Sequence, residues 1–124
     1  MKSAKTYLEE ANAVVTRISS ADAVAKHAAG GGIFVDIRDS ADIAKSGTIA
    51  GAHRIPRGFM EFAANAEMQF HNPVLQKDAA LYLVCGAGGQ AALAGKTLID
   101  MGCTNVTNVG GIGDWKAAGG PTED

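Results

Sequence analysis

The stretch that most constrains the fold is residues 81–101, LYLVCGAGGQAALAGKTLIDM. Residues 81–85 are apolar or aromatic without alternation, a pattern typical of a strand buried on both faces of a sheet. The four small residues at 86–89 are too flexible to continue a strand or a helix. Apolar residues then recur at helical spacing from Ala91 to Met101. The stretch therefore predicts a strand, a tight loop and a helix, with Cys85 at the end of the strand.

This position favours a reactive thiol at Cys85. The first backbone N–H groups of a helix have no partner within the helix, and the helix dipole adds partial positive charge at the same end. Both effects stabilise a thiolate relative to a thiol, so we expect Cys85 to be a nucleophile. Its small neighbours also predict that the sulfur is exposed.

The second cysteine, Cys103, follows the far end of the same predicted helix. A helix of about 12 residues rises about 18 Å, whereas a disulfide requires Cα atoms within roughly 7 Å of each other. We therefore expect no disulfide with Cys85 and assign Cys103 to inert packing.

The remainder of the chain alternates short apolar segments with helical segments. The expected strands are residues 14–18, 33–36, 53–55, 81–85 and 106–109. The expected helices are residues 3–12, 20–29, 40–46, 59–66 and 91–101. In the helix at 59–66 we expect Phe59, Phe62 and Ala63 to face inward. This alternation predicts an α/β fold with a central parallel five-stranded sheet and helices on both of its faces.

Length and charge exclude several classes of function. A chain of 124 residues indicates one domain, in which residues 1–12 form a helical extension and residues 119–124 a frayed end. A net charge of −2 and a pI near 5.9 give no basic surface for nucleic acid or an anionic membrane. The longest uncharged apolar run is far shorter than the roughly 20 residues of a spanning helix. With two cysteines, three scattered histidines and no signal sequence, we expect a cytoplasmic protein without a metal or cofactor.

Four stretches of the sequence, in order, resemble motifs of the single-domain rhodanese-like sulfurtransferases. The first, Asp36-Ile37-Arg38-Asp39 followed by Asp42, is similar to an Asp-x-Arg signature at a strand end. The second, GTIAGAHRIP at 47–56, is similar to a Gly-x-Ile-x-Gly-Ala…Ile-Pro segment. The third is the six-residue loop CGAGGQ at 85–90, and the last is the closing segment GGIGDWKAAGGP at 110–121. Together they cover nearly the whole chain.

The resemblance implies a sulfur relay through a persulfide. Cys85 would take a sulfane sulfur from a donor such as thiosulfate or an organic persulfide. A thiol or cyanide-like acceptor, or a protein acceptor, would then receive it. The implied substrate-binding residues are Gly86, Ala87, Gly88, Gly89, Gln90 and Arg57. Asp36 and Arg38 are expected to support the loops around the site, with an Arg38–Asp42 pair as one arrangement.

One residue departs from the family pattern. The active-site loop of the family commonly ends in arginine, and here that position is Gln90. A dianionic donor would lose its nearest cation, which leaves the identity of the donor open. The departure is also consistent with an alternative function: the chain would be a non-catalytic interaction module of this family or a persulfide carrier of low activity.

Two other functions fit parts of the same loop. Residues 86–91, GAGGQA, match the glycine pattern of dinucleotide-binding proteins, but no acidic residue follows at the end of the next predicted strand to hold a ribose. A phosphatase of related fold needs cysteine, five residues and then arginine, and the arginine position is Ala91. The sequence favours sulfur transfer over both.

Overall fold

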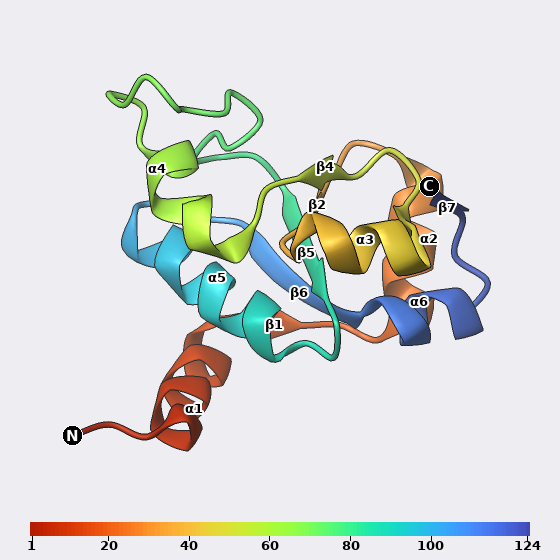
Figure 1. Cartoon of the computed structure of the whole chain (residues 1–124), viewed down its shortest axis with the longest axis horizontal. Coiled ribbons are helices and arrows are strands. Elements are labelled where there is room, and N and C mark those ends of the chain that lie inside the picture. Colours follow the sequence, from red (N-terminus) through yellow and green to blue (C-terminus); the bar gives the residue numbers. More distant parts are fainter.

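The computed structural model describes residues 1–124 and has a mixed α/β fold (Figure 1). The strands are β1 (Thr16–Arg17), β2 (Ile33–Asp36), β3 (Thr48–Ile49), β4 (His53–Arg54), β5 (Leu81–Cys85), β6 (Val106–Gly111) and β7 (Thr122–Glu123). The helices are α1 (Ala4–Val14), α2 (Ser20–Ala29), α3 (Ser40–Ser46), α4 (Met60–Ala64), α5 (Gly89–Asp100) and α6 (Ile112–Ala117), with a 3-10 turn η1 (Arg57–Phe59) before α4. None of these helices combines the length and the apolar character needed to cross a bilayer.

Five strands form the central sheet in the order β1-β6-β5-β2-β4, and every neighbouring pair is parallel. The predicted five-stranded parallel sheet is therefore confirmed. Because the strands are parallel, their carboxyl ends lie at one edge of the sheet. Asp36 is in register with Val84, and Cys85 with Gly111, so the loops after β2, β5 and β6 meet beside the cysteine.

Helices cover both faces of the sheet. On one face, Leu81, Leu83 and Cys85 of β5 pack with buried residues of α4 and α5 in a cluster of 14 buried residues. On the other face, Val84 packs with residues of α2 and α6, among them the fully buried Trp115. Strand β5 is thus covered on both sides, which explains its unbroken apolar sequence.

Helix α1 forms an additional outer layer against α5 (Figure 1). Ala11 is completely buried there, and Val15 lies just beyond the end of the helix. A Cβ atom at Gly95 would approach Val15 Cγ1 to 2.9 Å, so glycine is the residue that permits this close packing. The N-terminal helix is a docked part of the domain.

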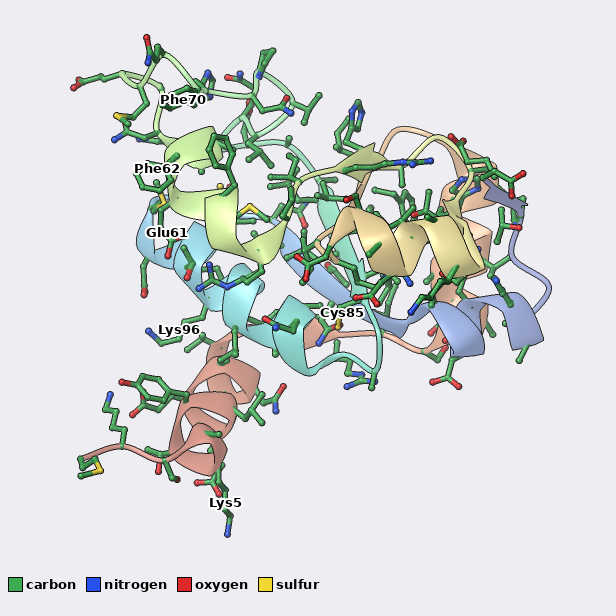
Figure 2. All side chains as sticks on the ribbon, in the orientation of Figure 1. Lys5, Glu61, Phe62, Phe70, Cys85 and Lys96 are labelled. Carbon is green, nitrogen blue, oxygen red and sulfur yellow. The ribbon has the colours of Figure 1, made fainter.

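The expected inward orientation of Ala63 is confirmed, but that of Phe59 and Phe62 is wrong. Met60 and Ala63 are buried, whereas Phe59 and Phe62 are 39% and 47% exposed. Phe59 belongs to the 3-10 turn η1, and α4 begins only at Met60, which takes the inward position in its place. The Phe59 ring contacts the rings of Phe62 and Phe70. Phe62 and Phe70 lie at an end of the molecule far from Cys85 (Figure 2).

The expected fraying of residues 119–124 is also wrong. Thr122–Glu123 pair in antiparallel fashion with Thr48–Ile49, and the Trp115 indole N–H donates to the Pro121 carbonyl at 3.0 Å. Helix α1 continues through Val14, so the first strand is shorter than expected, and residues 112–117 form helix α6, which is not among the expected helices. These segments carry too few apolar residues for a sequence pattern to reveal tertiary pairing.

Asp36 and Arg38 form a buried ion pair at the end of β2. Asp36 is fully buried, and Arg38 donates to both of its carboxylate oxygens, at 2.7 Å in the closest contact. The Thr48 hydroxyl donates to the same carboxylate at 2.7 Å. Arg38 also donates to Ser46 Oγ and the Gly47 carbonyl, and no Arg38–Asp42 ion pair is present, so that suggested pair is wrong. The pair joins β2 to α3 and β3.

We predict that Asp36→Ala lowers the free energy of unfolding by about 3–5 kcal/mol, because it leaves the Arg38 guanidinium buried without its counterion. Urea denaturation measures the change. The matched control is Glu9→Ala, which removes the exposed Lys5–Glu9 pair and should cost less than about 1 kcal/mol. Similar losses in the two variants would contradict the structural role of the Asp36–Arg38 pair.

Candidate active site

Cys85 ends β5 with its sulfur enclosed by the following loop. The Gly88 N–H donates to Cys85 Sγ at 3.0 Å, and the Ala91 N–H donates to it at 3.3 Å. Two backbone donors on one sulfur favour the thiolate, because they stabilise negative charge without needing a charged side chain. Gly88 is one of the implied substrate-binding residues, whereas Ala91, in the first turn of α5, is not among them.

The expected exposure of this sulfur is wrong, since Cys85 is only 1% exposed. Small residues do follow the cysteine, but their backbone folds back over it. Gly88 has a left-handed backbone with φ of 104°, which side chains disfavour. A Cβ atom at Gly111 would overlap the Gly86 carbonyl oxygen. Glycine at these two positions therefore allows the loop to close around the sulfur and against β6.

Two residues outside the predicted site hold this loop in place. Asn108 on β6 is buried, donates from Nδ2 to the Gly88 carbonyl at 2.8 Å, and accepts from the Gly110 N–H at 2.8 Å. Arg17 donates to the Ala87 carbonyl at 3.4 Å. In a trans peptide the C=O and the following N–H point in opposite directions, so a donor on the Ala87 oxygen helps aim the Gly88 N–H at sulfur.

Of the two, only Asn108 could be noticed in the sequence, as an amide side chain in the middle of a predicted strand. A buried amide needs partners for both its oxygen and its nitrogen, and here the nitrogen has the Gly88 carbonyl of the active-site loop while the oxygen has the Gly110 N–H of β6. The role of Arg17 could not be predicted from the sequence, because Arg17 lies far from the loop along the chain and reaches it through the pairing of β1 with β6.

A cavity of about 490 Å³ opens above Cys85. Its lining comes from the ends of β2 and β5, from α3, from η1 and from α5, and consists of Ile37, Arg38, Asp39, Asp42, Lys45, Ser46, Arg57, Cys85, Gly86 and Gln90. Two guanidinium groups line this cavity. Arg38 is neutralised by the buried Asp36, whereas Arg57 has only the exposed Glu61 as a counterion. Asp39 and Asp42 offset part of the positive charge.

Arg57 is held at the edge of the cavity. Its guanidinium donates to Glu61 Oε1 at 3.1 Å and to Thr97 Oγ1 at 3.0 Å. The Glu61 side chain is 53% exposed, so this ion pair contributes little and can be exchanged for another anion.

The structure brings together most of the residues that the sequence singled out. Cys85, Gly86, Gln90, Arg57 and Arg38 line the cavity. Gly88 acts through its N–H, and Asp36 acts through Arg38. The side chain of Ala87 and residue Gly89 do not line this cavity, and no cluster of three His, Cys, Asp or Glu residues could hold a metal ion.

Cys103 lies beyond the far end of α5, and both cysteines are free thiols. It is buried, and burial raises the pKa of the Cys103 thiol, an effect that nearby Lys77 partly opposes. A thiol with a raised pKa carries little thiolate at neutral pH, so Cys103 is a poor nucleophile.

The rhodanese-like domain model matches residues 20–118, and the chain belongs to this family. Its fold is therefore of the sulfurtransferase type. Helix α1 lies outside the matched region. No curated protein matches the chain.

Solved structures agree on the fold. A Rhodopseudomonas palustris protein of unknown function, described as a possible tyrosine phosphatase, is 37% identical with a TM-score of 0.94, over 99% of this chain and 96% of that one. A rhodanese-like domain from Anabaena is 29% identical with a TM-score of 0.64, over 75% of this chain and 99% of that one. The human single-domain sulfurtransferase is 23% identical with a TM-score of 0.72, over 83% and 96%, a similarity of fold alone.

We predict that Asn108→Leu slows alkylation of Cys85 by iodoacetamide about tenfold at neutral pH, because losing a donor that orients the loop weakens a hydrogen bond to the thiolate by about 1–1.5 kcal/mol. Thr107→Val, on the same strand, is the control and should leave the rate unchanged. Equal rates for Asn108→Leu and the unmodified protein at neutral pH would show that the amide does not orient the loop.

Proposed function

We propose that this protein is a sulfurtransferase that carries a sulfane sulfur as a persulfide on Cys85. The observation that supports this most is the pair of N–H groups on Cys85 Sγ, at the base of a cavity that also contains Arg57. The family and the sulfurtransferase-type fold agree with the proposal. Covalent transfer of this kind needs a thiolate that can both attack and leave, and backbone donors assist in both roles.

With thiosulfate the first step forms one S–S bond and breaks another. The Cys85 thiolate attacks the outer sulfur, the S–S bond of thiosulfate breaks, and its electron pair leaves with sulfite. A thiolate or cyanide acceptor then attacks the outer sulfur of the persulfide and expels the Cys85 thiolate. The N–H groups of Gly88 and Ala91 stabilise the anion at the start and at the end of the cycle.

Two side chains at the cavity wall would determine which donor reacts best. Arg57 supplies a positive charge after it exchanges Glu61 for an anionic donor. Gln90 offers hydrogen bonds but no charge. A cavity with this lining suits a donor of low charge, such as an organic persulfide, better than it suits dianionic thiosulfate.

A phosphatase has less support in this chain. The Rhodopseudomonas palustris protein is described as a possible tyrosine phosphatase, and its similarity makes the activity worth assaying. Phosphoryl transfer depends on strong positive charge around the transferred group. Here the position that a phosphatase loop would give to arginine is Ala91, which is fully buried and donates its N–H to the sulfur.

A non-catalytic interaction module is the remaining alternative. This alternative is supported by position 90, where the loop has glutamine and the family commonly has arginine. Against it stands the geometry of Cys85, since a module without chemistry has no need of two N–H groups on a sulfur that lines a cavity.

We predict that incubation with a sulfur donor adds the mass of one sulfur atom to the protein, and that cyanide removes it. Cys85→Ser should abolish the added mass, because the nucleophile is lost. Cys103→Ser is the matched control and should retain it. Intact-mass spectrometry measures all three proteins. No added sulfur with either thiosulfate or an organic persulfide, or equal loss in both variants, would reject the proposed function.

We also predict that Gln90→Arg raises kcat/KM for thiosulfate about tenfold, mainly through KM, because a charged hydrogen bond exceeds a neutral one by roughly 1–2 kcal/mol. An uncharged organic persulfide should gain nothing from the same change. Both donors are compared at fixed ionic strength, since salt screens a charge effect. If thiosulfate kinetics do not change, residue 90 takes no part in donor binding.

A further inference from the structure

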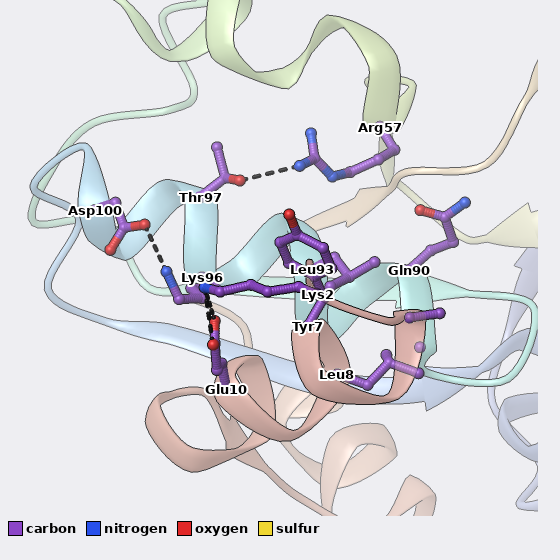
Figure 3. A pocket seen from close by; sticks show the side chains of 12 residues that line it. Lys2, Tyr7, Leu8, Glu10, Arg57, Gln90, Leu93, Lys96, Thr97 and Asp100 are labelled. Atoms are coloured by element: carbon purple, nitrogen blue, oxygen red, sulfur yellow. Dashed lines mark hydrogen bonds and ion pairs between the residues drawn. The ribbon is translucent and has the colours of Figure 1, made fainter.

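A cavity of about 640 Å³ lies between α1 and α5 (Figure 3). Helix α1 contributes Ala4, Tyr7, Leu8 and Glu10, with Lys2 just before it; α5 contributes Gly89, Gln90, Leu93, Lys96, Thr97 and Asp100. Its volume is within the range of small-molecule sites, about 300–1,000 Å³. We call this cavity the α1–α5 groove.

The groove adjoins the cavity above Cys85, because Arg57 and Gln90 line both. Arg57 also donates a hydrogen bond to Thr97 Oγ1 inside the groove (Figure 3). A molecule whose sulfur reaches Cys85 past these two side chains would therefore find room for its remaining atoms in the groove. Thiosulfate is too small to use that room.

The groove has an apolar part and a charged part. Tyr7, Leu8 and Leu93 lie toward the Gln90 end, and the pairs Lys2–Glu10 and Lys96–Asp100 lie toward the other (Figure 3). Both pairs have N–O distances of 2.9 Å and are partly exposed. Exposed pairs contribute little, so they can exchange partners with a ligand that carries both an ammonium and a carboxylate.

The spacing along α5 sets the length of the ligand. Residues six to ten positions beyond Gln90 on a helix lie about 9–15 Å further along its axis. This span matches a cysteine-containing peptide of two or three residues, with the sulfur at one end and charged groups at the other.

We propose that the α1–α5 groove binds the organic part of a zwitterionic, peptide-sized persulfide, R–S–SH, whose outer sulfur is delivered to Cys85. The inference rests on the proposed function and names its donor class. The Cys85 thiolate attacks the outer sulfur, the S–S bond of the donor breaks, and its electron pair leaves on R–S⁻. The outer sulfur carries its proton to Cys85, so the products are Cys85–S–SH and R–S⁻, or Cys85–S–S⁻ and R–SH once that proton passes to the leaving thiolate.

The test compares donors and variants in the full-length protein. The donors are thiosulfate, the persulfide of mercaptoethanol and glutathione persulfide as a tripeptide probe. Leu93→Trp fills the groove without touching the cavity above Cys85, and the double variant Lys96→Asp/Asp100→Lys reverses the polarity of an ion pair while retaining it. Val14→Trp, an exposed change on α1 outside the groove, is the control for an added surface indole. Thermal unfolding confirms that each variant is folded.

Leu93→Trp should raise KM for glutathione persulfide about tenfold, as expected when contacts worth about two buried methylene groups are lost. Its kcat/KM for thiosulfate should stay within about twofold of the unmodified protein. The polarity reversal should raise KM for glutathione persulfide but not for the mercaptoethanol persulfide. Val14→Trp should change none of these values.

The outcomes separate the inference from the proposed function. If all donors load Cys85 but the groove variants affect them equally or not at all, the groove is not the donor site and the inference fails alone. If the variants slow only removal of sulfur by an acceptor, the groove serves the acceptor and the donor assignment is overturned. If no donor loads Cys85, the inference and the proposed function fail together.

Discussion

The active site depends on two backbone N–H groups that point at one sulfur atom. Gly88 and Ala91 can donate to Cys85 only because the chain turns from β5 into α5 within a few small residues. That turn requires a left-handed backbone at Gly88 and the absence of a side chain at Gly111. The parallel sheet then places the end of β6 against the loop, and Asn108 holds the Gly88 carbonyl of that loop. The nucleophile is thus arranged by main-chain geometry.

The charges around the sulfur are consistent with this arrangement. The buried Asp36–Arg38 pair belongs to the framework, and its neutralised guanidinium adds little to the cavity above Cys85. Arg57 is shared between that cavity and the α1–α5 groove, and Gln90 stands beside it without charge. A site that holds its thiolate with backbone dipoles needs few cations for that purpose. Under the proposed function, its side chains are therefore free to discriminate between donors.

The sequence predicted the parts of the structure that follow from local patterns. The uniform apolar run of β5, the small residues after it and the helical spacing of α5 were sufficient for the strand–loop–helix unit and for the position of Cys85. Parts that depend on tertiary contact could not be predicted in the same way. The burial of Cys85, the pairing of Thr122–Glu123 with β3 and the reach of Arg17 to Ala87 all arise between segments distant in sequence. The outward phenylalanines of η1 and α4 accompany a helix that begins at Met60 and buries Met60 and Ala63 instead.

The most direct test is a crystal structure of the protein after reaction with a sulfur donor. We predict one added sulfur atom about 2.05 Å from Cys85 Sγ, the length of an S–S bond, projecting into the cavity beside Arg57 and Gln90. The Gly88 and Ala91 N–H groups should remain directed at the cysteine sulfur or at the added atom. An unmodified Cys85 under conditions that add sulfur to Cys103, or a loop whose N–H groups point away from the sulfur, would contradict the central role of the backbone donors.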